Sequence, residues 1–349
     1  MVKSTDVLFI VKDRLINKKT QHHGLRNAGM FISDYLRSIG IDSQLTIIPD
    51  GGYLDATLKS FRPKVVIMEA MWLKPEKFVS IAKENPFVKE IIVRVHSDIT
   101  YFSIEPKGFQ FLFDIQEIND KFPGDTPVFK SALNALNFSD STKNLFKEDF
   151  TYLPNIYDKP FRKSKKELRS NRIDIACYGA IRLLKNHIQQ ALAAMQAADE
   201  LGKILYFRIN DVDNDAGSTI RASLELLFRK NGKHKLVVDA WRPHGEFLDL
   251  IRSSDIGIQL SMTESFNIVA ADFISQGTPI IGGESITWLP EELKCSGTDV
   301  REIVDTIKRV YKSRNSRDLQ ENAYNNLNEY NNHAKQAWED YLKPLLEKS

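Results

Sequence analysis

The sequence has little cysteine, no long apolar run and almost no net charge, and each absence bears on what the protein can be. Its 349 residues include only Cys177 and Cys295, which are too few for a disulfide framework and lack the spacing of metal ligands. No apolar stretch approaches the roughly 20 residues that a membrane-spanning helix needs. Basic residues number 48 and acidic residues 46, so the whole-chain charge does not indicate a nucleic-acid partner.

Apolar residues are plentiful enough to build more than one core. They make up 42% of the chain, and a length of about 150 residues per domain predicts two domains. The segment Met1–Asp6 leads directly into an apolar run without the pattern of a signal peptide. With so few cysteines, this favours a cytoplasmic protein.

The first half of the chain alternates predicted strands and helices. A strand is expected at Asp6–Lys12, and a helix follows from about Leu25 to Ser38, before Gly40. Further strands are expected at Gln44–Ile48, Lys64–Met68, Glu90–Val95 and Ala135–Phe138. The apolar ones run without alternation, as parallel strands buried on both faces do, so this half predicts a doubly wound α/β sheet.

The second half repeats this alternation after a basic segment at 156–172, whose polar composition suits an interdomain linker. A strand is predicted at Ile173–Gly179, and a helix follows near His187–Leu201. Further strands are expected at Ile204–Ile209, Lys235–Ala240, Asp255–Leu260 and Pro279–Ile281. The two halves therefore predict two Rossmann-like α/β domains, at 1–155 and 173–325.

The most informative stretch runs from Glu264 to Gly282, because it places two carboxylates around a helix start just after a buried strand. Asn267 can cap a helix that begins near Ile268, and the N–H groups of its first turn would then face a phosphate. Glu264 precedes this turn and Asp272 lies just over one turn inside it. Both side chains can point toward one ligand at the carboxyl end of the strand, which indicates a sugar-nucleotide site.

This stretch resembles the E-x7-E region of retaining glycosyltransferases of the GT-B fold, especially family four. The resemblance implies that Glu264 binds hydroxyls of the donor sugar and that Asp272, where the usual residue is Glu, binds the ribose. It further implies two domains that face a cleft and a C-terminal helix, at 326–349, that packs back on the first domain. The donor is expected to contact Ser265, Phe266, Asn267 and Ile268 as well.

A second segment, Gly179 to Lys185, resembles the Gly-Arg…Lys segment of the same family. The resemblance implies that Gly179 lies near the donor and that Arg182 and Lys185 neutralise the charge on the leaving diphosphate. Only two residues separate Arg182 from Lys185, fewer than in most members. Trp241 and Arg242 stand where the family has its nucleotide-base loop, so we expect them to contact the base.

Two loops of the first half supply the remaining candidates. Gly24 follows the first strand, where GT-B enzymes have a glycine-containing loop, and it permits close approach to the donor. His96 resembles the histidine that touches the donor sugar in related enzymes and is expected to be catalytic, with Asp98 orienting it or contacting the acceptor. The predicted acceptor-binding residues are Arg14, Lys18, Lys19, His22, His23, Arg26 and Glu69.

The basic residues of the first loop and the linker suit a phosphate-rich acceptor. The overall plan also resembles bacteriophage DNA glucosyltransferases, which modify hydroxymethylated bases extruded from the duplex. That resemblance implies a DNA acceptor and, for a phage-encoded chain, a place in the host cytoplasm. Polysaccharide, lipid-linked glycan and protein acceptors remain open alternatives.

The reaction implied by the resemblance is sugar transfer with retention, from a UDP-linked donor and without a cofactor. Inversion with Asp98 or Glu69 as the base is the alternative. Two other functions stay open, a nucleotide-sugar-binding protein without turnover and a sugar-nucleotide epimerase of the same fold.

The segment from Asp211 to Gly217 contains three alternating aspartates that resemble a metal-binding loop. A calcium loop of the EF-hand type needs glycine at its sixth position and glutamate at its twelfth, where this chain has Ala216 and Ala222. A solvated loop is therefore the prediction, and no metal is expected.

Overall fold

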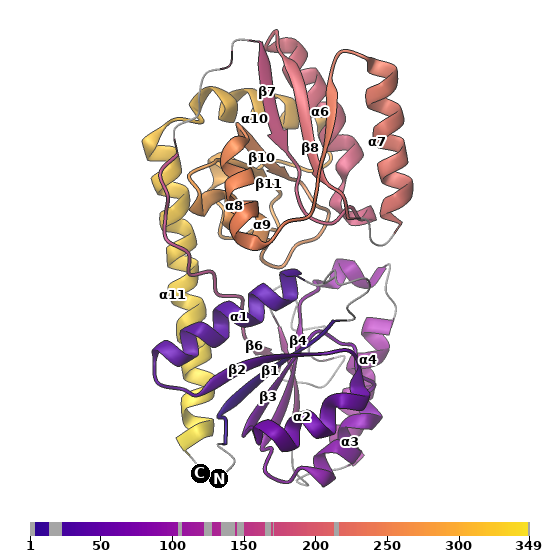
Figure 1. Ribbon diagram of the computed structural model, residues 1–349, viewed down its shortest axis with the longest axis vertical. Helices are drawn as coiled ribbons and strands as arrows, with labels where there is room; N and C mark the ends of the chain where they lie inside the picture. Colours follow the sequence, from indigo (N-terminus) through magenta and orange to yellow (C-terminus); the bar gives the residue numbers. More distant parts are fainter. Residues whose placement is uncertain are drawn as a thin grey trace. The chain divides into compact units, whose positions relative to one another are not determined.

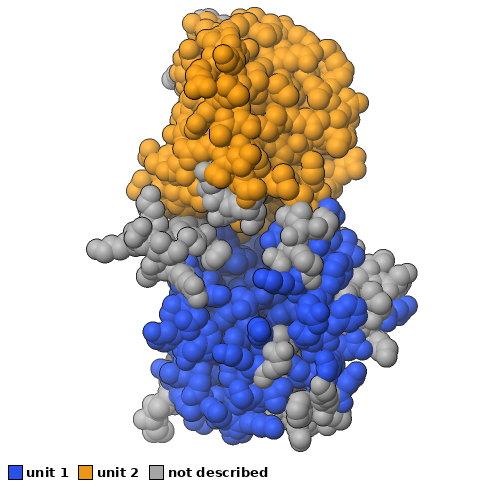
Figure 2. Space-filling model, turned by 90° about the vertical axis from the view of Figure 1, so that its right-hand side faces the viewer, with its two compact units in different colours: residues 1–158, 331–349 blue, residues 159–330 orange. Residues whose placement is uncertain are grey.

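The computed structural model describes residues 4–13, 23–103, 107–121, 128–133, 144, 150–164, 169, 171–212 and 216–347 (Figure 1). Contacts divide the chain into two compact units, which Figure 2 shows in blue and orange. Unit 1 comprises Met1–Asp158 and Asn331–Ser349, and unit 2 comprises Lys159–Tyr330. The domain boundaries inferred from the sequence stay predictions, and the strand predicted at Ala135–Phe138 lies outside the described residues.

Unit 1 is built on a six-stranded sheet in the order β2-β1-β3-β4-β5-β6, with every pairing parallel. β1, β3 and β4 are buried along most of their length, which is why their sequences are continuous apolar runs. The strands are β1 (Val7–Lys12), β2 (Ser43–Ile48), β3 (Val65–Glu69), β4 (Glu90–Val95), β5 (Val128–Leu133) and β6 (Thr151–Tyr152). β1, β2, β3 and β4 confirm four of the five strands predicted in this half.

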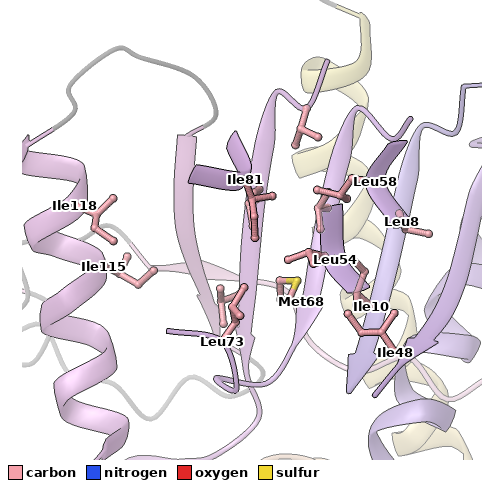
Figure 3. Packing of buried hydrophobic residues seen from close by; sticks show 14 of the residues in the cluster. Leu8, Ile10, Ile48, Leu54, Leu58, Met68, Leu73, Ile81, Ile115 and Ile118 are labelled. Carbon is pink, nitrogen blue, oxygen red and sulfur yellow. The ribbon is translucent and has the colours of Figure 1, made fainter. Parts of the chain in front are cut away.

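The helices of unit 1 cover its sheet. They are α1 (His23–Ser38), α2 (Leu54–Phe61), α3 (Pro75–Glu84) and α4 (Lys107–Lys121), with short 3₁₀ turns η1 (Gly51–Tyr53) and η2 (Ile99–Ser103). Figure 3 shows how Leu8 and Ile10 of β1 and Met68 of β3 pack with apolar residues of α2, α3 and α4, among them Leu54 and Ile115. This cluster is the core on one face of the sheet.

Side chains that alternate with these along β1 point to the opposite face. There the ring centroid of Phe9 lies 5.8 Å from that of Trp338, which belongs to the long helix α11 (Arg317–Glu347). Trp338 is fully buried and donates a hydrogen bond from Nε1 to the carbonyl of Pro154, 2.8 Å away. The last part of α11 is therefore integral to the core of unit 1.

Unit 2 contains a five-stranded parallel sheet in the order β11-β10-β7-β8-β9. Its strands are β7 (Arg172–Ala176), β8 (Ile204–Asn210), β9 (Lys235–Asp239), β10 (Ile256–Gln259) and β11 (Ile280–Gly282). Its helices are α6 (His187–Glu200), α7 (Gly217–Asn231), α8 (His244–Ser253), α9 (Ile268–Ser275) and α10 (Val300–Ser313), with 3₁₀ turns η3 (Leu183–Lys185) and η4 (Glu291–Leu293). All five strands predicted in this half are present.

In each sheet the order of the strands along the chain reverses at one point, which is characteristic of a doubly wound fold. The switch falls between β1 and β3 in unit 1 and between β7 and β10 in unit 2. Each unit is thus Rossmann-like, as the sequence predicts. In such sheets ligands bind outside the carboxyl ends of the strands at the switch.

None of the helices within the described ranges combines the length and the apolar character that crossing a bilayer requires.

Candidate functional site

The switch point of unit 2 brings together the segments that follow β7 and β10. These strands pair in parallel, with Ile175 beside Ile256 and Ala176 beside Gly257, so both chains emerge at the same edge. Gly257 lets α9 pack closely on β10, because a Cβ at this position would lie 2.7 Å from the ring of Phe273. The start of α9 is therefore held against the switch point.

Lys185 and Glu264 meet at this edge. The Nζ atom of Lys185 contacts Oε1 of Glu264, although 79 positions separate the two residues in the sequence. Their side chains are 23% and 11% exposed, so the pair is partly shielded from water yet remains open to a ligand. The structure thus brings together the two sequence motifs from which a sugar-nucleotide site was predicted.

The segment after β7 is shaped by backbone conformation. Gly179 has a φ of +108°, a region that favours glycine, and its N–H donates to Oδ1 of Asn210 over 2.8 Å. This turn ends β7 at Ala176 rather than at the predicted Gly179. Arg182 is extended and partly exposed, and Asn186 adopts the left-handed conformation just before α6.

A chain of buried amides connects this segment to α9. Nε2 of Gln259 donates to the carbonyl of Tyr178 over 2.7 Å, and Nδ2 of Asn267 donates to Oε1 of Gln259 over 3.2 Å. The N–H of Ala270 in turn donates to Oδ1 of Asn267 over 2.8 Å, which confirms the predicted helix cap. The position of Glu264, just before this cap, is fixed relative to the loop that carries Lys185.

Asp272 is buried rather than presented to a ligand. Its side chain is only 2% exposed, and its Oδ1 lies 2.7 Å from Nε2 of His244. The imidazole of His244, which is 20% exposed, contacts this carboxylate, so the direct ribose contact predicted for Asp272 would require the His244–Asp272 contact to open. His244 could not be identified from the sequence, because no pattern in the segment after β9 indicates that this histidine pairs with a residue of α9.

Phe266 also differs from its expected role as a donor contact. Its side chain is 1% exposed and lies between the rings of Trp288 and Tyr330, with centroid distances of 5.7 Å and 5.1 Å. The ring therefore stabilises the loop from inside, whereas Ser265 and Ile268 beside it are partly exposed.

The base-loop candidates lie between β9 and α8. The N–H of Trp241 donates to Oδ1 of Asp211 over 2.8 Å, and its side chain is partly buried. Arg242 is exposed and lies 3.8 Å from the carboxylate of Glu246. Asp213 and Asp215 lie outside the described residues, and within the described part of the chain no group of three or more His, Cys, Asp or Glu residues could hold a metal ion.

A second cluster lies at the carboxyl ends of β3 and β4 in unit 1. Glu69 is fully buried, and its oxygens contact Nη1 of Arg94 at 2.8 Å and Nε2 of His96. Because Glu69 is enclosed in this way, it cannot touch an acceptor directly as expected. Although burial opposes it, the positive charge of Arg94 and the contact with His96 hold the pKa of Glu69 below its usual value.

The remaining candidates of the first half lie outside the Glu69–Arg94–His96 cluster or outside the described residues. Asp98 is 6% exposed and accepts a hydrogen bond from the N–H of Tyr101 over 3.2 Å, so it caps the short turn η2. Gly24 and exposed Arg26 lie in the first turn of α1 rather than in a loop. Arg14, Lys18, Lys19 and His22 lie outside the described residues, as does the side chain of His23.

Comparison with known proteins identifies the fold. No protein-family profile and no curated protein sequence matches the chain. A sucrose-phosphate synthase from Thermosynechococcus elongatus is 12% identical with a TM-score of 0.69, over 99% of this chain and 100% of that one. Anabaena HepE in complex with UDP and glucose is 11% identical with a TM-score of 0.63, over 99% and 98% of the two chains.

The pneumococcal O-GlcNAc transferase GtfA, in complex with UDP and GlcNAc, is 13% identical with a TM-score of 0.54. The match covers 84% of this chain but only 60% of that larger protein. Together with the two doubly wound units, these matches show that the chain has the GT-B fold.

Proposed function

We propose that this protein is a glycosyltransferase that moves a sugar from a UDP-linked donor to an acceptor hydroxyl with retention of configuration. The observation that carries the proposal is the contact of Lys185 with Glu264 at the switch point of unit 2. A cation and a carboxylate at one site match two neighbouring parts of a nucleotide sugar, its diphosphate and the hydroxyls of its sugar. The fold, shared with structures that contain UDP and a sugar, supports this assignment.

Arg182, Lys185 and Glu264 act on two parts of the donor in the proposed reaction. Arg182 and Lys185 bind the diphosphate and neutralise the charge that grows on it as the glycosidic bond breaks. Glu264 then exchanges its bond to Lys185 for hydroxyls of the donor sugar. Because the departing phosphate itself accepts the proton of the acceptor in the front-face route, Glu264 serves recognition and no protein base is needed.

In this proposal the contact to the donor nucleotide is made by His244, which Asp272 positions. Since Asp272 is buried against Nε2 of His244, the partly exposed imidazole is the group that the ribose can reach. In this proposal Asp272 orients His244, and the pair replaces the longer glutamate of the family pattern.

We infer that the acceptor is a hydroxymethylated base in DNA, on the strength of exposed basic residues. Arg26, Arg162 and Lys163 are exposed and suit phosphates. Arg169 and Arg172 contribute less, because both form ion pairs with the buried carboxylate of Asp174.

The acceptor is tested by incubating the protein and a sugar donor with hydroxymethylated DNA and with unmodified DNA of the same sequence. Sugar attached only to the hydroxymethylated DNA is the expected result. Turnover with a glycan, lipid or protein acceptor and none with this DNA would refute the acceptor while leaving the transferase intact.

Donor binding is tested by titrating UDP and other nucleoside diphosphates into wild type and Lys185→Ala, with calorimetric detection. We expect UDP affinity to fall about 10- to 100-fold in the variant, because a charge-assisted bond to phosphate is lost. Lys230→Ala is the matched control, since Lys230 is an exposed lysine of the same unit at the end of α7. Unchanged affinity in Lys185→Ala would show that the diphosphate lies elsewhere.

A further inference from the structure

Glu69, Arg94 and His96 form a cluster of contacting ionisable side chains at the ends of two neighbouring strands of unit 1. Glu69 ends β3, and Arg94 and His96 lie at the end of the neighbouring strand β4, beside the switch point of unit 1. Glu69 and Arg94 are both completely buried, whereas the His96 side chain is 15% exposed. The cluster thus leads from the interior to a surface where a doubly wound sheet binds ligands.

Arg94 is held in place from several directions. Its Nη1 donates to Glu69, its Nη2 donates to Oδ1 of Asn155 over 2.8 Å, and its Nε donates to the carbonyl of Leu153 over 3.2 Å. Its guanidinium also lies 5.4 Å from the ring centroid of Trp338. Nη1 lies 2.8 Å from Oε1 of Glu69 and 3.0 Å from Oε2, the oxygen that also contacts His96. An arginine fixed in this way keeps Glu69 ionised and holds its carboxylate against the imidazole.

The state of the imidazole follows from these contacts. An ionised carboxylate can only accept hydrogen bonds, so the ring nitrogen that contacts Glu69, which is Nε2, must carry the proton. Burial lowers the pKa of His96, and the positive charge of Arg94 lowers it further against the opposing effect of Glu69. A neutral ring with its proton on Nε2 has a lone pair on Nδ1.

We propose that Glu69 is a positioning residue that holds His96 in the Nε2–H form, so that Nδ1 accepts a hydrogen bond from a ligand hydroxyl. Nδ1 has no hydrogen-bond partner among the residues that the structure describes. Such an acceptor selects a group that carries a proton, such as a sugar hydroxyl, and disfavours a bare phosphate oxygen. The identity of the ligand rests on the proposed function, whereas the form of the ring does not.

The form of the ring is tested directly by nitrogen NMR. Protein labelled with ¹⁵N-histidine is examined at neutral pH by long-range proton–nitrogen correlation, and the His96 signals are assigned by their loss in His96→Gln. We expect a protonated Nε2 and an unprotonated Nδ1 in the wild type. A protonated Nδ1, whether in the neutral or in the cationic ring, would overturn the proposal without any variant of Glu69.

Glu69→Gln tests the cause. Because a guanidinium can only donate hydrogen bonds, Arg94 will bind the amide oxygen of the glutamine, and the amide NH₂ will face His96. Nε2 must then accept a hydrogen bond, so the proton of the ring will move to Nδ1. Glu90→Gln is the matched control, because Glu90, which begins β4, is likewise a buried carboxylate and accepts a hydrogen bond from the hydroxyl of Tyr341. An unchanged His96 spectrum in folded Glu69→Gln would refute the role of Glu69.

The ligand is tested by turnover of the nucleotide-sugar donor. We expect kcat/KM to fall at least about tenfold in Glu69→Gln, since an acceptor has become a donor, and to stay unchanged in Glu90→Gln. Unchanged turnover in Glu69→Gln with a shifted ring proton would refute the hydroxyl contact. Absence of turnover in the wild type with every donor would refute the proposed function, while the NMR result still decides the form of the ring.

Discussion

At the scale of single residues, Lys185 and Glu264 form an ion pair that is only partly shielded from water, whereas Asp272 and Glu69 are buried against other side chains. Lys185 and Glu264 could be selected from the sequence because each follows a predicted strand, next to a glycine turn or a helix cap. The partners of Asp272 and Glu69 could not be foreseen in the same way. His244, Arg94 and His96 pair with these carboxylates through tertiary contacts, and no local pattern encodes which carboxylate becomes buried.

Burial also determines how one histidine of unit 2 responds to acid. His187 begins α6 directly after Asn186, and burial, assisted by the nearby charge of Lys185, lowers its pKa to about 4. In the unfolded chain a histidine titrates near about 6.5. Below this pH the unfolded chain therefore binds a proton that the folded protein does not, so folding stability falls as the pH drops toward about 4.

We expect the wild type to lose about 2 kcal/mol more stability than His187→Gln between about pH 7.5 and about pH 5. Urea unfolding of both proteins at the two pH values measures this difference, and the other histidines cancel because both proteins contain them. His333→Gln, which replaces an exposed histidine, should behave as the wild type does. Equal pH dependence in His187→Gln and the wild type would contradict the buried neutral state.

At the scale of elements, the strands were the most predictable parts because buried parallel strands need continuous apolar runs. β5 was missed, since Val128–Leu133 contains Lys130 and Ser131 and does not form such a run. The helices that cover the sheets were mostly not predicted from the sequence, because their apolar residues mark a face only once the sheet beneath them is known. Sequence therefore indicated the two sheets better than the layers around them.

The end of α9 allows one element boundary to be tested. Gly277 has a φ of +62°, and a Cβ there would lie 2.6 Å from the carbonyl oxygen of Arg162 and 2.7 Å from the N–H of Ser164. Gly232, at the end of α7, has a φ of +71° with open space around the Cβ position. The two glycines share a backbone conformation and differ in their surroundings.

We expect Gly232→Ala to cost about 1 kcal/mol from the left-handed conformation alone. Gly277→Ala should cost about 3 kcal/mol, because the added methyl group also collides with backbone that cannot easily move. Chemical denaturation of both variants measures the two values. Equal losses of unfolding free energy in the two variants would show that the backbone around Arg162 moves to accommodate the methyl group without loss of stability.

At the scale of the whole molecule, the order of the strands in each sheet determines where the candidate sites lie. Two repeats of strand–helix alternation predicted two Rossmann-like units, and the structure adds the strand orders that locate both switch points. Sequence alone did not give these orders, because neighbours in a parallel sheet are set by crossover connections rather than by local pattern. The Lys185–Glu264 contact falls at one switch point, and the Glu69–His96 contact falls beside the other.

The most direct test of the proposed transferase is the release of nucleoside diphosphate from a panel of nucleotide sugars, measured with acceptor for wild type, Glu264→Ala and Arg182→Ala. The account predicts release from a UDP-linked donor by the wild type and a loss of at least about 100-fold in each variant, with circular dichroism unchanged. Release at the wild-type rate by either folded variant would contradict the site, and no release from any donor by the wild type would contradict the function.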